Sequence, residues 1–246
     1  MLKEQVQSFD ERRDLFVGKD SQSTIAFATE HWTHTAQRAI QQRGRFAIAL
    51  SGGHTPEAIY AALIKSTAID WNKIWLFWSD ERSVPLDHPD SNYHMAMRYF
   101  AQVPIPLDQI FPMHAEKTLK QNAKNYEELI RRHLDSHLFD LVMLGLGEDG
   151  HTASLFPNTA ALSEETALVA ANHVPSQNTW RMTLTFPCIN QSTHIACYAL
   201  GSKKAQILSQ VLQAAIQSPF PASRIGTPQH RALWILDAPA AKQINV

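Results

Sequence analysis

Short apolar runs alternate with longer amphipathic stretches along most of the chain. The runs are long enough for buried strands, and they cover 46–51, 74–78, 141–144, 194–200 and 232–236. Helical spacing of apolar residues predicts helices over 20–42, 56–65, 91–100, 118–134 and 203–214. This alternation is typical of βαβ units around a parallel sheet. It predicts an α/β protein with a three-layer, Rossmann-like, mainly parallel sheet and helices on both faces. We expect one domain over residues 1–246, with room for a small subdomain.

Polar residues, proline and glycine mark the ends of the predicted helices. Asp20 can cap the first long helix, and Gly44 can end it. Thr55 followed by Pro56 is typical of an N-cap and a first helical turn. Residues 152–155 are predicted to begin a further short helix. Several helix N-termini would then lie close to the ends of strands.

Composition restricts the kinds of partner. The chain has 246 residues, of which 44% are hydrophobic, and a net charge of −1, which argues against nucleic acid. Two cysteines, Cys188 and Cys197, are too few for a disulfide framework or a tetrahedral metal site. We find neither a signal peptide nor an apolar run of membrane-spanning length. We therefore expect a cytoplasmic protein without a membrane partner, and a monomer by default.

Polar residues gather directly after the predicted strands. Because ligands bind at the carboxyl ends of parallel strands, we expect these residues to share one site. The groups are Ser51–Gly52–Gly53, Asp80–Glu81–Arg82, 145–151 and 201–204. Within the third group, Asp149 and His151 pair an acid with a base two residues away.

The turn at Ser51, Gly52 and Gly53 precedes a helix, so its N–H groups and the helix dipole can bind an anion. A tight strand-to-helix turn without a ligand is the structural alternative. Ser51 also resembles a degraded nucleophile elbow, which would make a serine hydrolase with His151 or His230 as its base. The first glycine of that elbow is missing, which weighs against this alternative.

Basic residues at the strand ends are candidates for binding phosphate. Arg82 and Arg181 offer planar forks of donors suited to phosphate oxygens. Lys204 begins a helix after Gly201, and we expect it to face the site while its neighbour Lys203 faces water.

Two further histidine pairs have the spacing of a helical face. They are His31 with His34, and His133 with His137. No carboxylate completes either pair as a zinc motif, so we interpret both as surface histidines and expect no metal site.

Taken together, five motifs resemble those of the 6-phosphogluconolactonase family, in the same order. They are SGGHTP, SDERSVPLDHPDSNY, GLGEDGHTASLFP, WRMTLTFP and GSKKA. The resemblance implies hydrolysis of 6-phospho-D-glucono-1,5-lactone to 6-phosphogluconate in the oxidative pentose phosphate pathway. It also implies no metal or organic cofactor, and a fold shared with glucosamine-6-phosphate deaminases and ribose-5-phosphate isomerases.

The related deaminases are the main alternative. In their glycine loop the histidine is followed by I-A-F-N-E-P, whose glutamate takes part in opening the sugar ring. This chain continues as TASLFP, so that Phe156 stands where the glutamate would be. Arg82 also follows Asp80 and Glu81 as it does in the lactonases. A non-catalytic phosphosugar-binding module is a second alternative, and it would not need His151.

For a lactonase, the resemblance leads to a set of expected roles. His151 would be the general base, since an unperturbed imidazole has a pKa of about 6.5. Asp149 would orient it. The remaining roles concern binding. The N–H groups of Gly52, Gly53 or Gly147 would support the oxyanion, Arg82, Lys204 and Arg181 would hold the phosphate, and Asp80 and Asn92 would bind sugar hydroxyls.

Overall fold

A seven-stranded sheet forms the centre of the computed structural model, which describes residues 5–134, 138–216 and 218–244. The strand order is β1-β2-β10-β9-β6-β3-β4, and every neighbouring pair except β1–β2 is parallel. The strands are β1 (Gln7–Ser8), β2 (Arg13–Gly18), β3 (Phe46–Leu50), β4 (Ile74–Trp78), β6 (Leu141–Gly145), β9 (Ile195–Ala199) and β10 (Ala232–Asp237).

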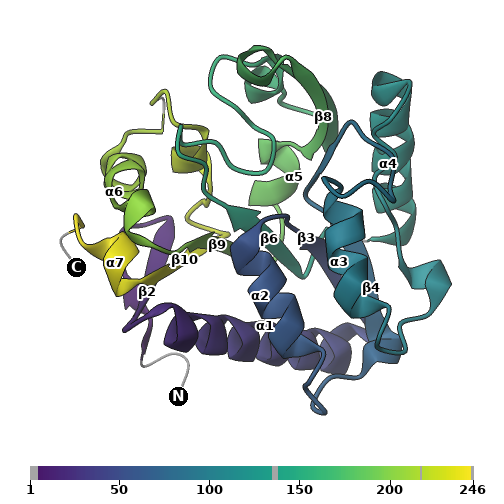
Figure 1. Ribbon diagram of the computed structural model, residues 1–246, viewed down its shortest axis with the longest axis horizontal. Coiled ribbons are helices and arrows are strands. Elements are labelled where there is room, and N and C mark those ends of the chain that lie inside the picture. The colour runs from purple at the N-terminus through teal and green to yellow at the C-terminus, as the bar shows by residue number, and fades with distance from the viewer. Residues whose placement is uncertain (1–4, 135–137, 217, 245–246) are drawn as a thin grey trace.

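Helices cover this sheet on both faces. All residues of β3 and β9 are buried, as expected for parallel strands between two helical layers. Figure 1 shows α1 on one side of the sheet and α5 and α6 on the other. The helices are α1 (Ser21–Arg43), α2 (His54–Leu63), α3 (Asn92–Phe100), α4 (Leu119–His133), α5 (Phe186–Asn190), α6 (Ala205–Gln213) and α7 (Ala238–Ala241). The predicted three-layer α/β class is confirmed.

Two of the predicted helix ends are confirmed, and one is wrong. Asp20 accepts a hydrogen bond from the N–H of Ser23 at 2.8 Å and begins α1, while Gly44 ends it with φ of 75°. The N-cap of α2 is Gly53, however, and not Thr55. Gly53 has φ of 99°, which glycine adopts readily, so the chain enters the helix two residues earlier than predicted.

A second, smaller sheet lies beyond the first. Its antiparallel order is β5-β8-β7, with β5 (Asp80–Arg82), β7 (Val169–Val174) and β8 (Thr179–Leu184). Figure 1 shows β8 on the opposite side of the molecule from α1. The sequence pattern did not predict β5 as a strand, because its polar residues Asp-Glu-Arg carry no apolar alternation. Its pairing with β8 places Arg82 opposite Arg181.

The predicted helix at 152–155 is wrong. Ala153 has a left-handed φ of 46°, and Thr152 and Leu155 form an isolated antiparallel bridge. The hydroxyl of Thr152 donates to the carbonyl of Gly145 at 2.8 Å. These contacts fold the segment back over the glycine turn, so it provides no helix N-terminus for an anion.

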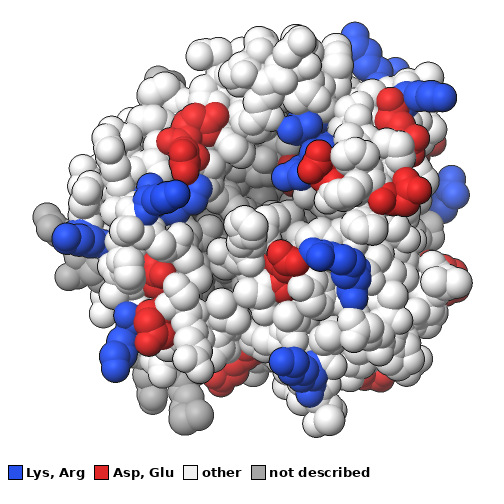
Figure 2. Space-filling view, in the orientation of Figure 1, with Lys and Arg blue, Asp and Glu red and all other residues white. Residues whose placement is uncertain are grey.

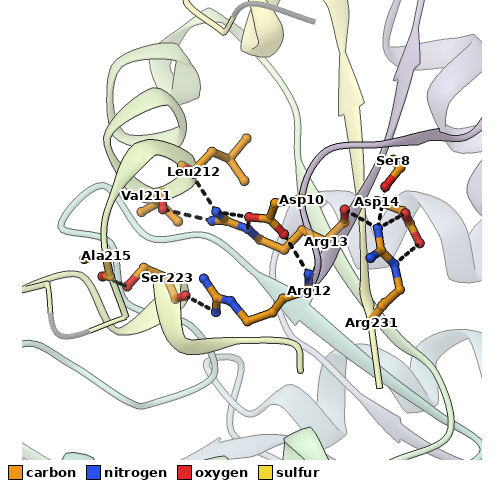
Figure 3. A network of polar contacts seen from close by, with 10 residues as sticks. All are labelled: Ser8, Asp10, Arg12, Arg13, Asp14, Val211, Leu212, Ala215, Ser223 and Arg231. Atoms are coloured by element: carbon orange, nitrogen blue, oxygen red, sulfur yellow. Dashed lines mark hydrogen bonds and ion pairs between the residues drawn. The ribbon is translucent and has the colours of Figure 1, made fainter. Parts of the chain in front are cut away.

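Two arginines tie β2 to the carboxyl-terminal part of the chain (Figure 3). Arg13 donates to the carbonyls of Val211 and Leu212 at 3.2 and 2.7 Å, and Arg12 donates to that of Ser223 at 3.0 Å. The same segment supports the central glycine turn, because the N–H of Ala222 donates to the carbonyl of Gly150 at 2.9 Å.

The histidine pairs do not form a metal site in the described ranges, where no group of three metal-ligating side chains converges. His133 lies 3.0 Å from the carbonyl of Leu129 through Nδ1, and its predicted partner His137 is outside the described residues. His31 is half-buried on α1 beside Phe27, and its Nδ1 has no hydrogen-bond partner in the described structure. Burial, together with nearby His194 and His34, lowers the pKa of His31 to about 4.

We expect His31 to weaken the fold in mild acid. In the unfolded chain its pKa is about 6.5, so the unfolded state binds a proton that the folded state excludes. The His31 contribution is therefore fully present above pH 6.5 and is lost as the pH falls toward 4. Urea unfolding should show that His31→Phe reduces the loss of stability between pH 7 and pH 5 by about 1–2 kcal/mol. The exposed control His114→Gln should leave this loss unchanged, and equal losses in His31→Phe and wild type would contradict the prediction.

Candidate active site

One cavity of about 370 Å³ brings together every predicted site residue except Asp149. Its walls come from the carboxyl ends of β3 and β6, from both arginine-bearing strands of the small sheet, and from the turn before α6. Figure 2 shows lysine and arginine side chains bordering a hollow in this face. The predicted residues that line the cavity are Ser51, Gly52, Gly53, Asp80, Arg82, Asn92, Gly147, His151, Arg181 and Lys204.

Asp149 does not line the cavity, but it contacts His151, which does. Its Oδ1 lies 2.5 Å from Nδ1 of the imidazole and also accepts the backbone N–H of His151 at 3.1 Å. A carboxylate at Nδ1 favours the tautomer whose proton sits on that nitrogen, and this leaves Nε2 with a free lone pair. The imidazole is therefore held by one nitrogen and is available as a base through the other.

Asp149 is held in its charged form. Partial burial acts to raise the pKa of Asp149, but the hydrogen bonds and the charge of His151 outweigh it, so the net pKa is lowered. An ionised Asp149 also stabilises the imidazolium that forms when His151 takes a proton.

The rest of the His151 environment is packed closely. Phe156 stacks on the imidazole with ring centroids 3.9 Å apart and an interplanar angle of 24°. A Cβ at Gly147 would lie only 2.0 Å from Nδ1 of His151, so a glycine is required there. The N–H of Gly147 donates to the carbonyl of His151 at 2.8 Å. That N–H cannot serve an oxyanion, which removes Gly147 from the predicted donors.

Two arginines line the cavity from the small sheet. Arg82 and Arg181 are directly opposite in the β5–β8 ladder. Arg82 donates to the carbonyl of Asp90 at 2.6 Å, and Arg181 donates to the side chain of Gln177 at 2.8 Å. Within the described part of the chain, neither forms an ion pair with a carboxylate within 4 Å. Burial and the neighbouring charge of Arg82 lower the pKa of Arg181. This arrangement is suited to an anion with two charges.

The two lysines before α6 lie as the sequence predicted. Lys204 is half-buried and lines the cavity, whereas Lys203 is exposed and lies outside it. Gly201, with φ of 90°, makes the turn that precedes them, and its N–H donates to the buried carboxylate of Asp237 at 2.9 Å. Asp237 also accepts the hydroxyl of Ser21 at 2.8 Å, so this turn is anchored to the start of α1.

The turn before α2 offers free backbone donors to the cavity. In the described part of the molecule, the N–H groups of Gly52 and Gly53 have no protein acceptor, and no side chain caps α2. The backbone of Ser51 is held at both its N–H and its carbonyl by the Tyr60 hydroxyl. No described histidine bonds to the Ser51 hydroxyl, and His230 precedes β10, at the amino ends of the parallel strands and away from the cavity. These positions argue against a serine nucleophile.

The acidic pair after β4 has two different surroundings. Asp80 lines the cavity, and its Oδ2 accepts the hydroxyl of Ser154 at 2.6 Å. Glu81 is fully buried and accepts the N–H groups of Arg82, Asn92 and Tyr93 at 2.8 Å. Burial raises the pKa of Glu81, while these hydrogen bonds oppose the rise. Glu81 therefore holds the start of α3 and does not face the cavity.

Asn92 has a structural contact as well as a place in the cavity wall. Its amide donates to the carbonyl of Asp80 at 2.8 Å, and its Oδ1 lies where a Cβ on Gly52 would be. Asn92 thus packs the glycine turn against the end of β4. Only a part of its side chain remains for a ligand, since it is 3% exposed.

Comparison with known proteins decides the family. Residues 19–234 match the family model described as glucosamine-6-phosphate isomerases/6-phosphogluconolactonase. A protein named 6-phosphogluconolactonase from Chlamydia pneumoniae is 42% identical over 93% of this chain and 90% of its own. The chain belongs to this family. A Synechocystis 6-phosphogluconolactonase is 39% identical over 85% of this chain and 88% of its own.

A solved structure of a protein named 6-phosphogluconolactonase has a similar fold. The crystal structure of a 6-phosphogluconolactonase from Thermotoga maritima superposes with a TM-score of 0.80, at 27% identity, over 91% of this chain and 98% of that one. The family model carries two activities in its description, so family membership alone does not choose between them.

Sequence reasoning assigned no role to three polar residues that line the cavity, namely Glu148, Ser154 and Gln177. Ser154 lies inside the GHTAS motif, and its contact with Asp80 joins two segments 74 residues apart. The only sequence feature that could have marked Ser154 as a site residue is its position three residues after His151. Gln177 lies in a polar loop with no pattern that marks it.

Gly147→Ala should break the contact between His151 and Asp149, because its Cβ would occupy the space of Nδ1. The clash is with a side chain that can rotate away, so we expect the fold to be retained. Nitrogen-15 NMR of the histidine rings should show a changed Nδ1 resonance for His151. Gly145→Ala is the matched control, since a Cβ there meets no atom within 4 Å. An unchanged His151 resonance in Gly147→Ala would contradict this account.

Proposed function

We propose that this chain is a 6-phosphogluconolactonase, which hydrolyses 6-phospho-D-glucono-1,5-lactone to 6-phosphogluconate. The observation that carries the proposal is the pairing of a carboxylate-bound histidine with two unneutralised arginines in one cavity. The histidine provides a base that can deprotonate water, and the arginines provide a binding site for a phosphate. Relatives named for this activity, such as the Chlamydia pneumoniae protein, support the same conclusion.

In the proposed reaction His151 acts as base and then as acid. Nε2 takes a proton from a water molecule as the water oxygen forms a bond to the lactone carbonyl carbon. The bond between that carbon and the ring oxygen then breaks, and the imidazolium returns its proton to the ring oxygen. The product is an open-chain acid, which ionises in water. Asp149 keeps the imidazole in the required tautomer throughout.

The other cavity residues have binding roles in this proposal. Arg82, Arg181 and Lys204 hold the phosphate, while the free N–H groups of Gly52 and Gly53 support the oxyanion. Asp80 accepts a hydrogen bond from a sugar hydroxyl, and Asn92 contributes to the same wall. The reaction as proposed uses no metal or organic cofactor.

The stacking of Phe156 on His151 favours the lactonase over the deaminase. Where the deaminase motif supplies a glutamate, this chain has an apolar ring against the imidazole. That ring provides no proton-transfer group for opening an amino sugar.

We also propose that residues 1–246 work as one domain, because the cavity takes residues from both sheets. No described helix is long and apolar enough to cross a membrane. A cytoplasmic location and a monomeric state stay predictions from the sequence.

The proposal is tested by acid release from freshly prepared 6-phosphogluconolactone, after the spontaneous rate is subtracted. We expect rapid turnover of this lactone, much slower turnover of the unphosphorylated lactone, and no ammonia from glucosamine 6-phosphate. Ammonia release would mean that the Phe156 interpretation is wrong. No turnover of any of the three would favour the non-catalytic phosphosugar-binding module.

Removal of the base should abolish most of the activity. We expect His151→Ala and Asp149→Asn to lower kcat by about 10²–10⁴-fold, with smaller effects on KM, because neither residue is assigned to phosphate binding. Protonation removes the base, so wild-type activity should fall in acid with a slope of one proton. A flat profile down to about pH 5, or full activity of His151→Ala, would exclude the histidine base.

The two adjacent lysines allow a matched test of phosphate binding. Lys204→Gln should raise KM for the phosphorylated lactone by about tenfold, since it removes a charge-assisted contact. Lys203→Gln removes the same charge one residue away and should leave KM unchanged. Equal effects of the two substitutions on KM would show that only net charge matters and would contradict the assignment.

A further inference from the structure

A second cavity, of about 450 Å³, lies at the amino ends of the strands of the main sheet. It is formed by α1 and by the beginnings of β9 and β10, where Ile195 and Leu233 line it. The proposed active site lies at the opposite, carboxyl ends of the strands. A five-residue strand is about 16 Å long, so the two cavities lie about one strand length apart.

The floor of the second cavity is apolar. Phe27 and Ile195 are almost fully buried beneath it. The ring of Phe27 stacks on Phe16 at 3.5 Å and lies nearly parallel to the ring of His31, at 6.3 Å and 14°. An apolar floor of this kind is suited to the apolar part of a ligand.

The rim carries donors without partners. His34 and Arg38 on α1, and His194 before β9, line the cavity, and their side chains form no hydrogen bond or ion pair in the described ranges. Nδ1 of His31 is buried, and none of the described residues forms a hydrogen bond with it. A buried polar atom normally has a partner, so this nitrogen is available to a ligand.

The nearby carboxylates are already neutralised. Asp14 is bound by Arg231 at 2.5 and 3.1 Å (Figure 3). The charge of Asp140 acts on His194. Asp140 is itself paired with Arg43 and accepts the N–H of Ala47 at 2.7 Å. The cavity therefore presents an excess of positive charge above an apolar floor.

We propose that this second cavity binds a small organic anion that has an apolar body and a carboxylate. The body lies against the apolar lining beside Leu233 and His31, and the carboxylate accepts hydrogen bonds from Arg38, His34 and His194. Burial and the charge of Arg38 lower the pKa of His194, although Asp140 opposes them. A bound carboxylate favours the charged imidazole, so binding near pH 7 should take up protons.

Calorimetric titration with 2-naphthoate is the test, with the neutral 2-naphthamide as its matched ligand. We expect saturable binding of the acid with a Kd near or below about 1 mM, and binding of the amide about tenfold weaker or not detectable. Arg38→Gln should raise Kd about fivefold, since it removes one charge contact. Arg132→Gln removes an exposed arginine on α4, outside both cavities, and should leave Kd unchanged.

Two further arms identify the site and the proton. Arg82→Gln/Arg181→Gln should retain binding, which excludes the proposed active site, whereas Leu233→Trp should fill the second cavity and prevent binding. Titrations at pH 7 in two buffers with different ionisation enthalpies should show proton uptake, which His34→Gln/His194→Gln should abolish. Equal binding of acid and amide, loss of binding only in the Arg82→Gln/Arg181→Gln variant, or no saturable binding at all would overturn the proposal.

Discussion

The proposed site depends on two arginines that the fold places against each other. Like charges directly opposite in an antiparallel ladder destabilise it by about 0.2–1 kcal/mol, and Arg82 and Arg181 occupy such a pair. Asp80, Glu81 and Asp90 act on Arg181 from a distance, but none pairs with it. The small sheet therefore carries an unfavourable interaction that an anion with two charges would relieve. Strain of this kind is typical of functional sites.

The two sheets contribute different parts of the chemistry. The main sheet ends in glycine turns that hold His151 against Asp149 and leave the N–H groups of Gly52 and Gly53 free. The small sheet brings the arginines into the same cavity. Hydrogen bonds connect the two, among them the one between Ser154 and Asp80. In the proposed complex the arginines bind the phosphate while His151 acts on the lactone of the same substrate.

The sequence predicted those parts that local rules determine. Buried runs such as 141–144 and the capping residue Asp20 depend on burial and on nearby hydrogen bonds, and both were confirmed. The local pattern of residues does not determine which distant segments will pair with each other. For this reason β5 was missed, and residues 152–155, whose side chains bond to Gly145 and Asp80, were wrongly predicted as a helix. Most of the cavity residues were predicted because they follow strands whose carboxyl ends meet, whereas Arg181, inside β8, was predicted because its side chain suits phosphate.

The arginine pair can be tested directly by urea unfolding of wild type and Arg181→Gln, with and without inorganic phosphate. Without an anion, we expect Arg181→Gln to be as stable as wild type or more stable by up to about 1 kcal/mol. With phosphate at about 100 times its Kd, wild type should gain about 2.7 kcal/mol and become the more stable of the two. A variant that is less stable without the anion, together with equal stabilisation of both proteins by phosphate, would contradict the claim that this pair is built for phosphate.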